Sequence, residues 1–76
     1  MKDQEIIKIL KEENEEFRKL VEEHQNLEKL LAKIDTKRYL TPDEEYERKR
    51  IQKQKLYKKD KMAGLIREYK KSHLNN

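Results

Sequence analysis

Apolar residues recur at helical spacing from residue 6 to residue 34. They lie three, four or seven positions apart, at Ile6, Leu10, Phe17, Leu20, Leu27, Leu31 and Ile34. In the corresponding heptads, only Glu13 and His24 interrupt the a and d positions. An apolar stripe with this period is typical of an amphipathic helix that buries one face. The pattern predicts a first helix over about residues 3–36.

The segment around Thr41 carries the signature of a helix start. Thr41 precedes Pro42, and Glu44 follows three residues after Thr41. Thr and Glu at this spacing form a capping box, and Pro is favoured at the first helical position. We therefore expect a loop over about residues 37–41, a second helix over about residues 42–71 and a frayed tail over residues 72–76. A loop this short permits only an antiparallel return.

The second helix has its own apolar stripe, which Lys55 and Lys58 interrupt. A fold in the chain at about residue 39 places the two stripes face to face. The expected fold class is therefore all-α, with one domain over residues 1–76 that forms a two-helix antiparallel hairpin with coiled-coil-like packing. The predicted hairpin core comprises Leu10, Phe17, Leu20, Leu27, Leu31, Ile34, Ile51, Met62, Leu65 and Tyr69.

A polar layer is expected in the middle of the hairpin. The fold at residue 39 brings Glu23 and His24 near Lys55, and it brings Glu16 near Lys58. A layer of His24, Glu23, Lys55 and Lys58 is interpreted as structural, because a polar group at a core position can fix register. Catalysis by His24 would need a second reacting group and a pocket, and a two-helix hairpin offers neither. The chain is predicted not to be an enzyme and to use no cofactor or metal.

Charge is distributed unevenly along the chain. Residues 1–36 carry a net charge of −3, whereas residues 37–76 carry +7. From Arg48 to Lys61 there are eight Lys or Arg and one acid, Asp60. This basic run either pairs with the acidic first helix or neutralises the phosphates of a nucleic acid. The face that would meet an anionic partner comprises Arg48, Lys49, Arg50, Lys53, Lys59 and Lys61.

Composition narrows the class of protein further. Of the 76 residues, 47% are charged, and there is one Gly and one Pro, which favours long helices over a sheet with frequent turns. The absence of Cys excludes disulfides and thiolate chemistry. No apolar run reaches the ~20 residues of a membrane span, and the first ten residues are too acidic for a signal peptide. A cytoplasmic location is expected.

The segments "EFRKLVEEHQNLEKLLAKI" and "KQKLYKKDKM" resemble the YdcH-like family of short bacterial proteins. The resemblance covers residues 6–70 and departs at Lys58, where the family usually has a leucine. The matching residues are Phe17, Leu20, His24, Leu27, Lys53, Gln54, Lys55, Leu56, Lys59 and Asp60. The resemblance implies a helical hairpin, and it brings no activity because none is established for that family.

Surplus apolar surface predicts that the hairpin associates. Ile9, Leu30, Leu56, Tyr57 and Ile66 lie off the facing stripes, and a single hairpin buries only one stripe per helix. A second copy packed on these residues would give a homodimeric four-helix bundle, and another helical protein is the other candidate partner. The predicted function is a non-enzymatic protein-interaction or structural module. Nucleic-acid binding through the basic second helix is the alternative.

Overall fold

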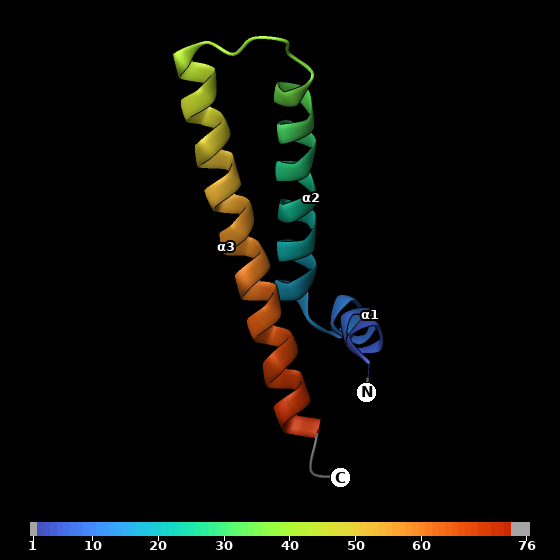
Figure 1. Ribbon diagram of the computed structural model, residues 1–76. Coiled ribbons are helices and arrows are strands. Elements are labelled where there is room, and N and C mark those ends of the chain that lie inside the picture. The colour runs from blue at the N-terminus through green and yellow to red at the C-terminus, as the bar shows by residue number, and fades with distance from the viewer. Residues whose placement is uncertain (1, 74–76) are drawn as a thin grey trace.

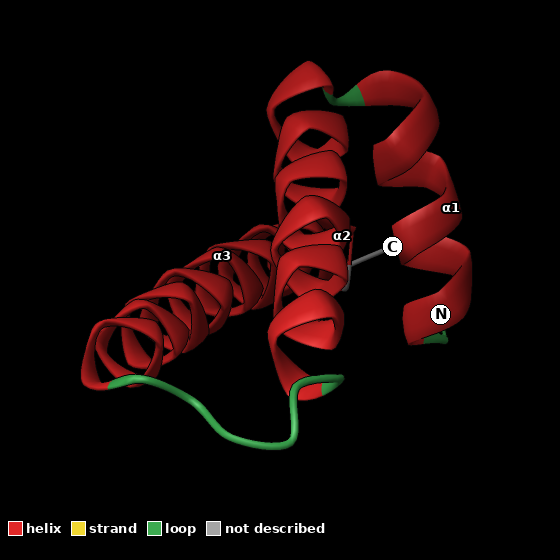
Figure 2. Cartoon of the chain, turned by 90° about the horizontal axis from the view of Figure 1, so that it is seen from above, coloured by secondary structure: helices red, strands yellow, loops and turns green. Residues whose placement is uncertain are grey.

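The computed structural model describes residues 2–73, and within that range all the regular structure is helical. The helices are α1 (Asp3–Glu13), α2 (Glu15–Asp35) and α3 (Pro42–His73). α2 and α3 lie side by side and run in opposite directions, joined by a loop over residues 36–41 (Figure 1). In the same view α1 is seen nearly end-on, so it lies crosswise to α2 at the end opposite the loop. Figure 2 shows α1 lying beside α2 when the chain is viewed from above.

The expected first helix over residues 3–36 is two helices, because the chain breaks at Asn14. Asn14 has an extended backbone, and its Oδ1 accepts a hydrogen bond from the Phe17 N–H at 3.0 Å, which caps the start of α2. Arg18 Nη1 donates to the last-turn carbonyls of α1, at 3.3 Å to Lys11 and 3.1 Å to Glu12. Both helix ends at the break therefore have partners for backbone groups that would otherwise lack them.

The predicted start of the last helix is confirmed. The Glu44 N–H donates to Thr41 Oγ1 at 3.1 Å, and the Thr41 N–H donates to Glu44 Oε1 at 3.0 Å. This reciprocal pair is the capping box expected from the sequence. α3 continues to His73, two residues beyond the predicted end, and the rest of the expected frayed tail lies outside the described residues. The loop begins one residue earlier than predicted, at Thr36.

The core lies mainly where α1 meets the other two helices. Ile6 is completely buried and Phe17 is 1% exposed. Leu10, Leu20, Leu31 and Ile51 are also buried. Around Ile6, Leu10 and Phe17 pack the partly buried side chains of Ile7, Val21, Met62, Leu65, Ile66 and Tyr69. Since α1 has only 11 residues, too few to be stable as an isolated helix, this packing is what holds it in place.

The structure corrects several details of the predicted core. Leu27 and Ile34, expected inside, are only half-buried, as are the three α3 residues Met62, Leu65 and Tyr69. Ile66 was expected off the facing stripes, yet it packs against the core cluster. The reason is the break at Asn14, after which α1 is out of line with α2 and packs against both α2 and α3.

Candidate interaction surface

The predicted polar layer forms only in part, and in a different register. Glu23 Oε2 lies 3.4 Å from Lys58 Nζ, three residues further along α3 than the predicted partner Lys55. Lys55 makes no ion pair among the described residues, and neither does Glu16. Lys58 therefore takes the role assigned to Lys55. The fold of the chain is displaced toward the C-terminus relative to residue 39.

His24 turns toward its own helix. Its Nδ1 lies 2.9 Å from Glu28 Oε1, one turn along α2, and neither Glu23 nor Lys55 bonds to it. The side chain is 17% exposed, and its Nε2 is buried without a hydrogen-bond partner in the described part of the chain. A buried nitrogen in this state costs stability, so His24 is a structural weak point in the middle of the hairpin.

A groove runs between α2 and α3, and we call it the Tyr57 groove. It has a volume of about 580 Å³ and is open to solvent. Its lining residues come from the middle of both helices: Glu23, Asn26, Leu27, Lys53, Gln54, Tyr57 and Lys58. Leu27 and the Tyr57 ring supply its apolar surface. None of the lining residues belongs to the cluster that α1 completes.

Exposed apolar side chains flank this groove. Tyr57 is 57% exposed, and Leu30, one turn beyond Leu27 on α2, is 47% exposed. The ammonium groups of Lys58 and Lys61 lie 6.0 and 5.6 Å from the centre of the Tyr57 ring. Contacts of this kind hold the ring at the surface and surround it with positive charge. The result is an aromatic side chain at the lip of a groove with a basic rim.

A second, smaller groove of about 260 Å³ also opens between the helices. It is lined by Leu31, Gln52, Lys55, Leu56 and Lys59. Leu56 is 58% exposed, nearly the same as its neighbour Tyr57. Adjacent positions on a helix point about 100° apart, so these two neighbours belong to different surfaces of α3. The second groove thus provides matched control positions for the first.

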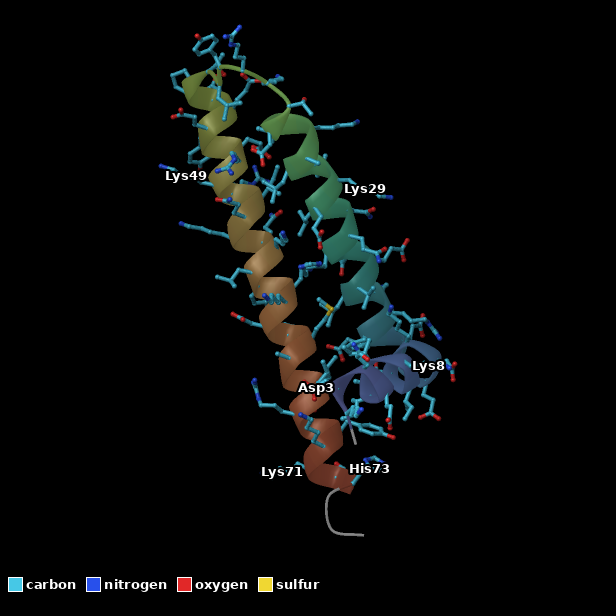
Figure 3. All side chains as sticks on the ribbon, turned by 45° about the vertical axis from the view of Figure 1, so that its right-hand side comes forward. Asp3, Lys8, Lys29, Lys49, Lys71 and His73 are labelled. Atoms are coloured by element: carbon cyan, nitrogen blue, oxygen red, sulfur yellow. The ribbon has the colours of Figure 1, made fainter. Side chains whose placement is uncertain are left out.

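The predicted anionic-partner face is not one face. Successive helical positions rotate by about 100°, so its six residues are distributed around the solvent side of α3. Arg48 Nε bonds to Asp35 Oδ1 at 2.7 Å, and Arg50 lies 3.7 Å from Glu47. The hydrogen bond and negative charge of Asp35 raise the pKa of Arg48. Figure 3 shows Lys49 on the side of α3 away from α2.

Within the described residues, Lys49, Lys53, Lys59 and Lys61 take part in no ion pair. The acidic half of the chain therefore neutralises only part of the basic run. Of the two sequence-based interpretations, pairing with the first half applies to Arg48 and Lys58. Five lysines of the run, these four together with Lys55, make no ion pair within the described residues.

The loop end is held by charge. Lys37 binds the Glu44 carboxylate across the turn. This hydrogen bond, together with the one from the Thr41 backbone N–H, lowers the pKa of Glu44 from 4.5 to about 2.

At the end of the molecule opposite the loop, Lys70 pairs with Asp3 and joins α3 to the start of α1. The His73 ring stacks on Tyr69 with 3.9 Å between centroids, so His73 belongs to the last turn of α3 and not to a frayed tail.

Among residues 2–73, no group of three or more His, Asp or Glu side chains is placed to hold a metal ion. None of the described helices is long and apolar enough to cross a bilayer.

Comparison with protein-family models, with characterised proteins and with solved structures finds no match for this chain. The resemblance to the YdcH-like family therefore stays a prediction from the quoted residues.

Proposed function

We propose that the protein is a non-enzymatic interaction module that binds a helix of a partner protein along the Tyr57 groove. The observation that carries this proposal is the groove itself. Tyr57 and Leu27 form an apolar lining between the antiparallel helices α2 and α3, and 57% of the Tyr57 surface is exposed to solvent. Tyr at the centre of a contact surface is a common energetic anchor, because it buries a large rigid ring at low entropic cost.

A helix is the partner element that suits this groove. Two helices side by side leave a furrow into which a third can pack its side chains as ridges. Amphipathic helices are recognised in this way, with apolar anchors spaced along one face. Leu27 and Tyr57 supply the apolar contacts within the groove, and Asn26 and Gln54 supply hydrogen-bonding groups to its lining. Leu30, which is exposed one turn further along α2, extends the apolar surface beyond the groove. The open shape of the groove suits a helix better than a small molecule, which needs a more enclosed site.

Site-specific photo-crosslinking tests this function. A benzophenone amino acid replaces Gln54, which lines the Tyr57 groove, or Gln52, which lines the second groove. Both positions are exposed glutamines on α3. After irradiation in nuclease-treated native cytosol, we expect a protein adduct from position 54 and none from position 52. Equal labelling from both positions, or none from position 54, would contradict the proposal.

Nucleic-acid binding remains the second candidate, and the lysines of the basic run that make no ion pair among the described residues favour it. Phosphate neutralisation by these lysines would make affinity for single-stranded RNA fall steeply with salt. Tyr57 could stack on a base. The test is a fluorescence-anisotropy titration of a 20-nucleotide RNA at about 50 and about 200 mM salt, the range over which several phosphate contacts lose orders of magnitude in affinity. Micromolar binding at low salt that Lys53→Gln and Lys61→Gln both weaken would establish this function.

A further inference from the structure

The two ends of the molecule are completed to different degrees. At one end α1 packs against α2 and α3, and Ile6 and Phe17 are almost entirely buried. Toward the loop, only two helices are present, and Leu31 and Ile51 are the buried residues there. Leu27 and Ile34, on the same stripe as Leu31, remain half-buried. Within residues 2–73, the loop half of the α2–α3 pair therefore lacks a third helix such as α1, which closes the other half.

The surface left open in the loop half has a definite charge pattern. On the α2 side of the Tyr57 groove is Glu23, half exposed even while it pairs with Lys58. On the α3 side are Lys53, within the groove, and Lys61 beside the Tyr57 ring. Among the lining residues, α2 therefore supplies the one acid, Glu23, and α3 supplies the two lysines, Lys53 and Lys58. A partner that matches it must present basic groups opposite α2 and acidic groups opposite α3.

A second copy of the chain meets this requirement in one arrangement. Two hairpins packed face to face can be related by a twofold axis along their length or by one across it. An axis across the length places α2 against α2, acid against acid. An axis along the length places α2 of each copy against α3 of the other, and the loops then lie at the same end. Like charges placed directly opposite one another are unfavourable, so the charge pattern selects the second arrangement.

We infer that two copies of this chain pair through the Tyr57 groove about a twofold axis that runs along the hairpin, with both loops at the same end. This inference rests on the proposed function and names the partner. Tyr57 of each copy packs on Leu27 of the other, because both residues line the same stretch of the groove. Glu23 of each copy faces Lys53 and Lys61 of the other. The contact generates a four-helix layer in the loop half, the packing in which hairpins of this kind close a core.

The size of the surface is compatible with a modest dimer interface. The molecule measures 54 × 19 × 17 Å, so a contact over its loop half is smaller than the roughly 800 Å² that each partner buries in a standard interface, and it falls in the range of weaker complexes. Four exposed or half-buried apolar residues lie along the proposed contact: Leu27, Leu30, Ile34 and Tyr57.

Mass and dilution measurements test the pairing. Sedimentation equilibrium of the intact chain should give twice 9.4 kDa at micromolar concentration. Tyr57→Ala should weaken the dimer by about tenfold or more, as for the loss of an interface anchor. Leu56→Ala, at the neighbouring and equally exposed position outside the groove, should leave the dissociation constant unchanged. Two results would overturn the inference. One is a sedimentation mass of a single chain even when the protein concentration is raised about 100-fold above micromolar. The other is an equal change of the dissociation constant in Tyr57→Ala and Leu56→Ala.

A spin label at Tyr39 tests the direction of the axis. The chain contains no Cys, and Tyr39 is an 83% exposed loop residue, so Tyr39→Cys accepts one label without disturbing the fold. Pulsed electron resonance should report a separation well below the 54 Å length of the molecule. A separation near that length would show loops at opposite ends and overturn the arrangement. If residue 54 crosslinks to a different protein while the chain sediments as a monomer, the proposed function stands and the second copy is excluded.

Discussion

At the scale of single residues, His24 shows how a polar side chain is only half accommodated on a packed face. The stripe of α2 places it toward α3, as its heptad position predicts, and its side chain is 17% exposed. Nδ1 finds Glu28, while the buried Nε2 finds no partner among the described residues. The heptad pattern predicted the burial of this residue. It could not predict the partner, because the side-chain torsion that selects Glu28 depends on packing.

Replacement of His24 by Leu should stabilise the fold. The change removes a buried nitrogen without a partner, which costs about 1–3 kcal/mol, and it gives up a pair at i,i+4 spacing worth about 0.2–0.5 kcal/mol. We expect a gain of about 1 kcal/mol in the free energy of unfolding, measured by urea denaturation at fixed protein concentration. Glu28→Gln, which removes the pair and keeps the imidazole, should change stability little. A loss of stability in His24→Leu would show that Nε2 has an essential partner.

Gly64 is a second residue at which the sequence departs from the best choice for a helix. It lies inside α3, and a Cβ built there meets only the Arg67 guanidinium at 3.8 Å, an ordinary contact. Gly64→Ala should therefore raise stability by about 0.5–1 kcal/mol through the higher helix propensity of Ala. Thermal unfolding monitored by circular dichroism would measure the gain. A fall in the unfolding midpoint would mean that another group packs against the backbone of Gly64 too closely to leave room for a Cβ.

At the scale of helices, α2 and α3 both begin at a residue whose side chain caps the helix, but the two starts were not equally predictable. Thr41 with Pro42 and Glu44 predicted α3 because the motif lies between two apolar stripes. Asn14 with Phe17 three residues later is an equally good N-cap, but the apolar period runs straight through it. Periodicity therefore favoured one long helix. The Asn14 cap and the acids Glu15 and Glu16 in the following turn were the signal that could have revealed the break.

Loss of the Asn14 cap should release α1. Asn14→Ala removes the acceptor for the Phe17 N–H, a change that costs about 0.5–2 kcal/mol. It also favours a helical residue 14, which would turn α1 out of its crosswise packing. We expect faster amide hydrogen exchange over residues 3–13 and lower stability to urea. Asn14→Asp, which keeps a capping oxygen, should behave like the original chain, and equal behaviour of the Ala variant would contradict this role.

The start of α3 should weaken in acid. The pKa of Glu44 is about 2 in the folded chain and 4.5 ordinarily, so the unfolded state binds the proton more readily. The stability that this carboxylate contributes is fully present above about pH 4.5 and is lost as the pH falls toward 2. Carbon-detected nuclear magnetic resonance titration of Glu44 should give a midpoint near 2. Lys37→Ala, which removes the largest cause of the shift, should move the midpoint upward, and a midpoint near 4.5 in the unaltered chain would contradict the loop geometry.

At the scale of the whole molecule, the sequence predicted the all-α class and five of the six buried residues in the described chain. It predicted two helices where residues 2–73 form three, and it did not predict how α1 meets the other helices. Register followed from a fold at residue 39, and the observed Glu23–Lys58 pair lies three residues away from that estimate. The difference arises because loop geometry and side-chain reach, which no periodicity contains, determine the offset. The sequence likewise predicted surplus apolar residues on the surface but not the groove, because the residues that line the groove depend on that offset.

Phe17 connects all three helices, so its truncation tests the entire fold. The residue is 1% exposed within the cluster that joins α1 to α2 and α3. Phe17→Ala should cost about 3–5 kcal/mol, a large fraction of the total stability of a domain this small. Urea denaturation should show the transition shifted sharply to lower concentration. Tyr39→Ala, at an 83% exposed loop position, is the matched control and should change stability by less than about 0.5 kcal/mol.

The crosswise position of α1 has a consequence for how long any assembly of this protein can grow. Straight hairpins can overlap end to end and extend into fibres, because their last turns offer unfilled apolar positions to the next molecule. Here α1 lies across the start of α2, and Ile6 of α1 is completely buried. A neighbouring molecule therefore meets α1, and not the apolar stripe of α2, if it approaches the start of α2 lengthwise. The straightening expected of Asn14→Ala would remove this obstacle.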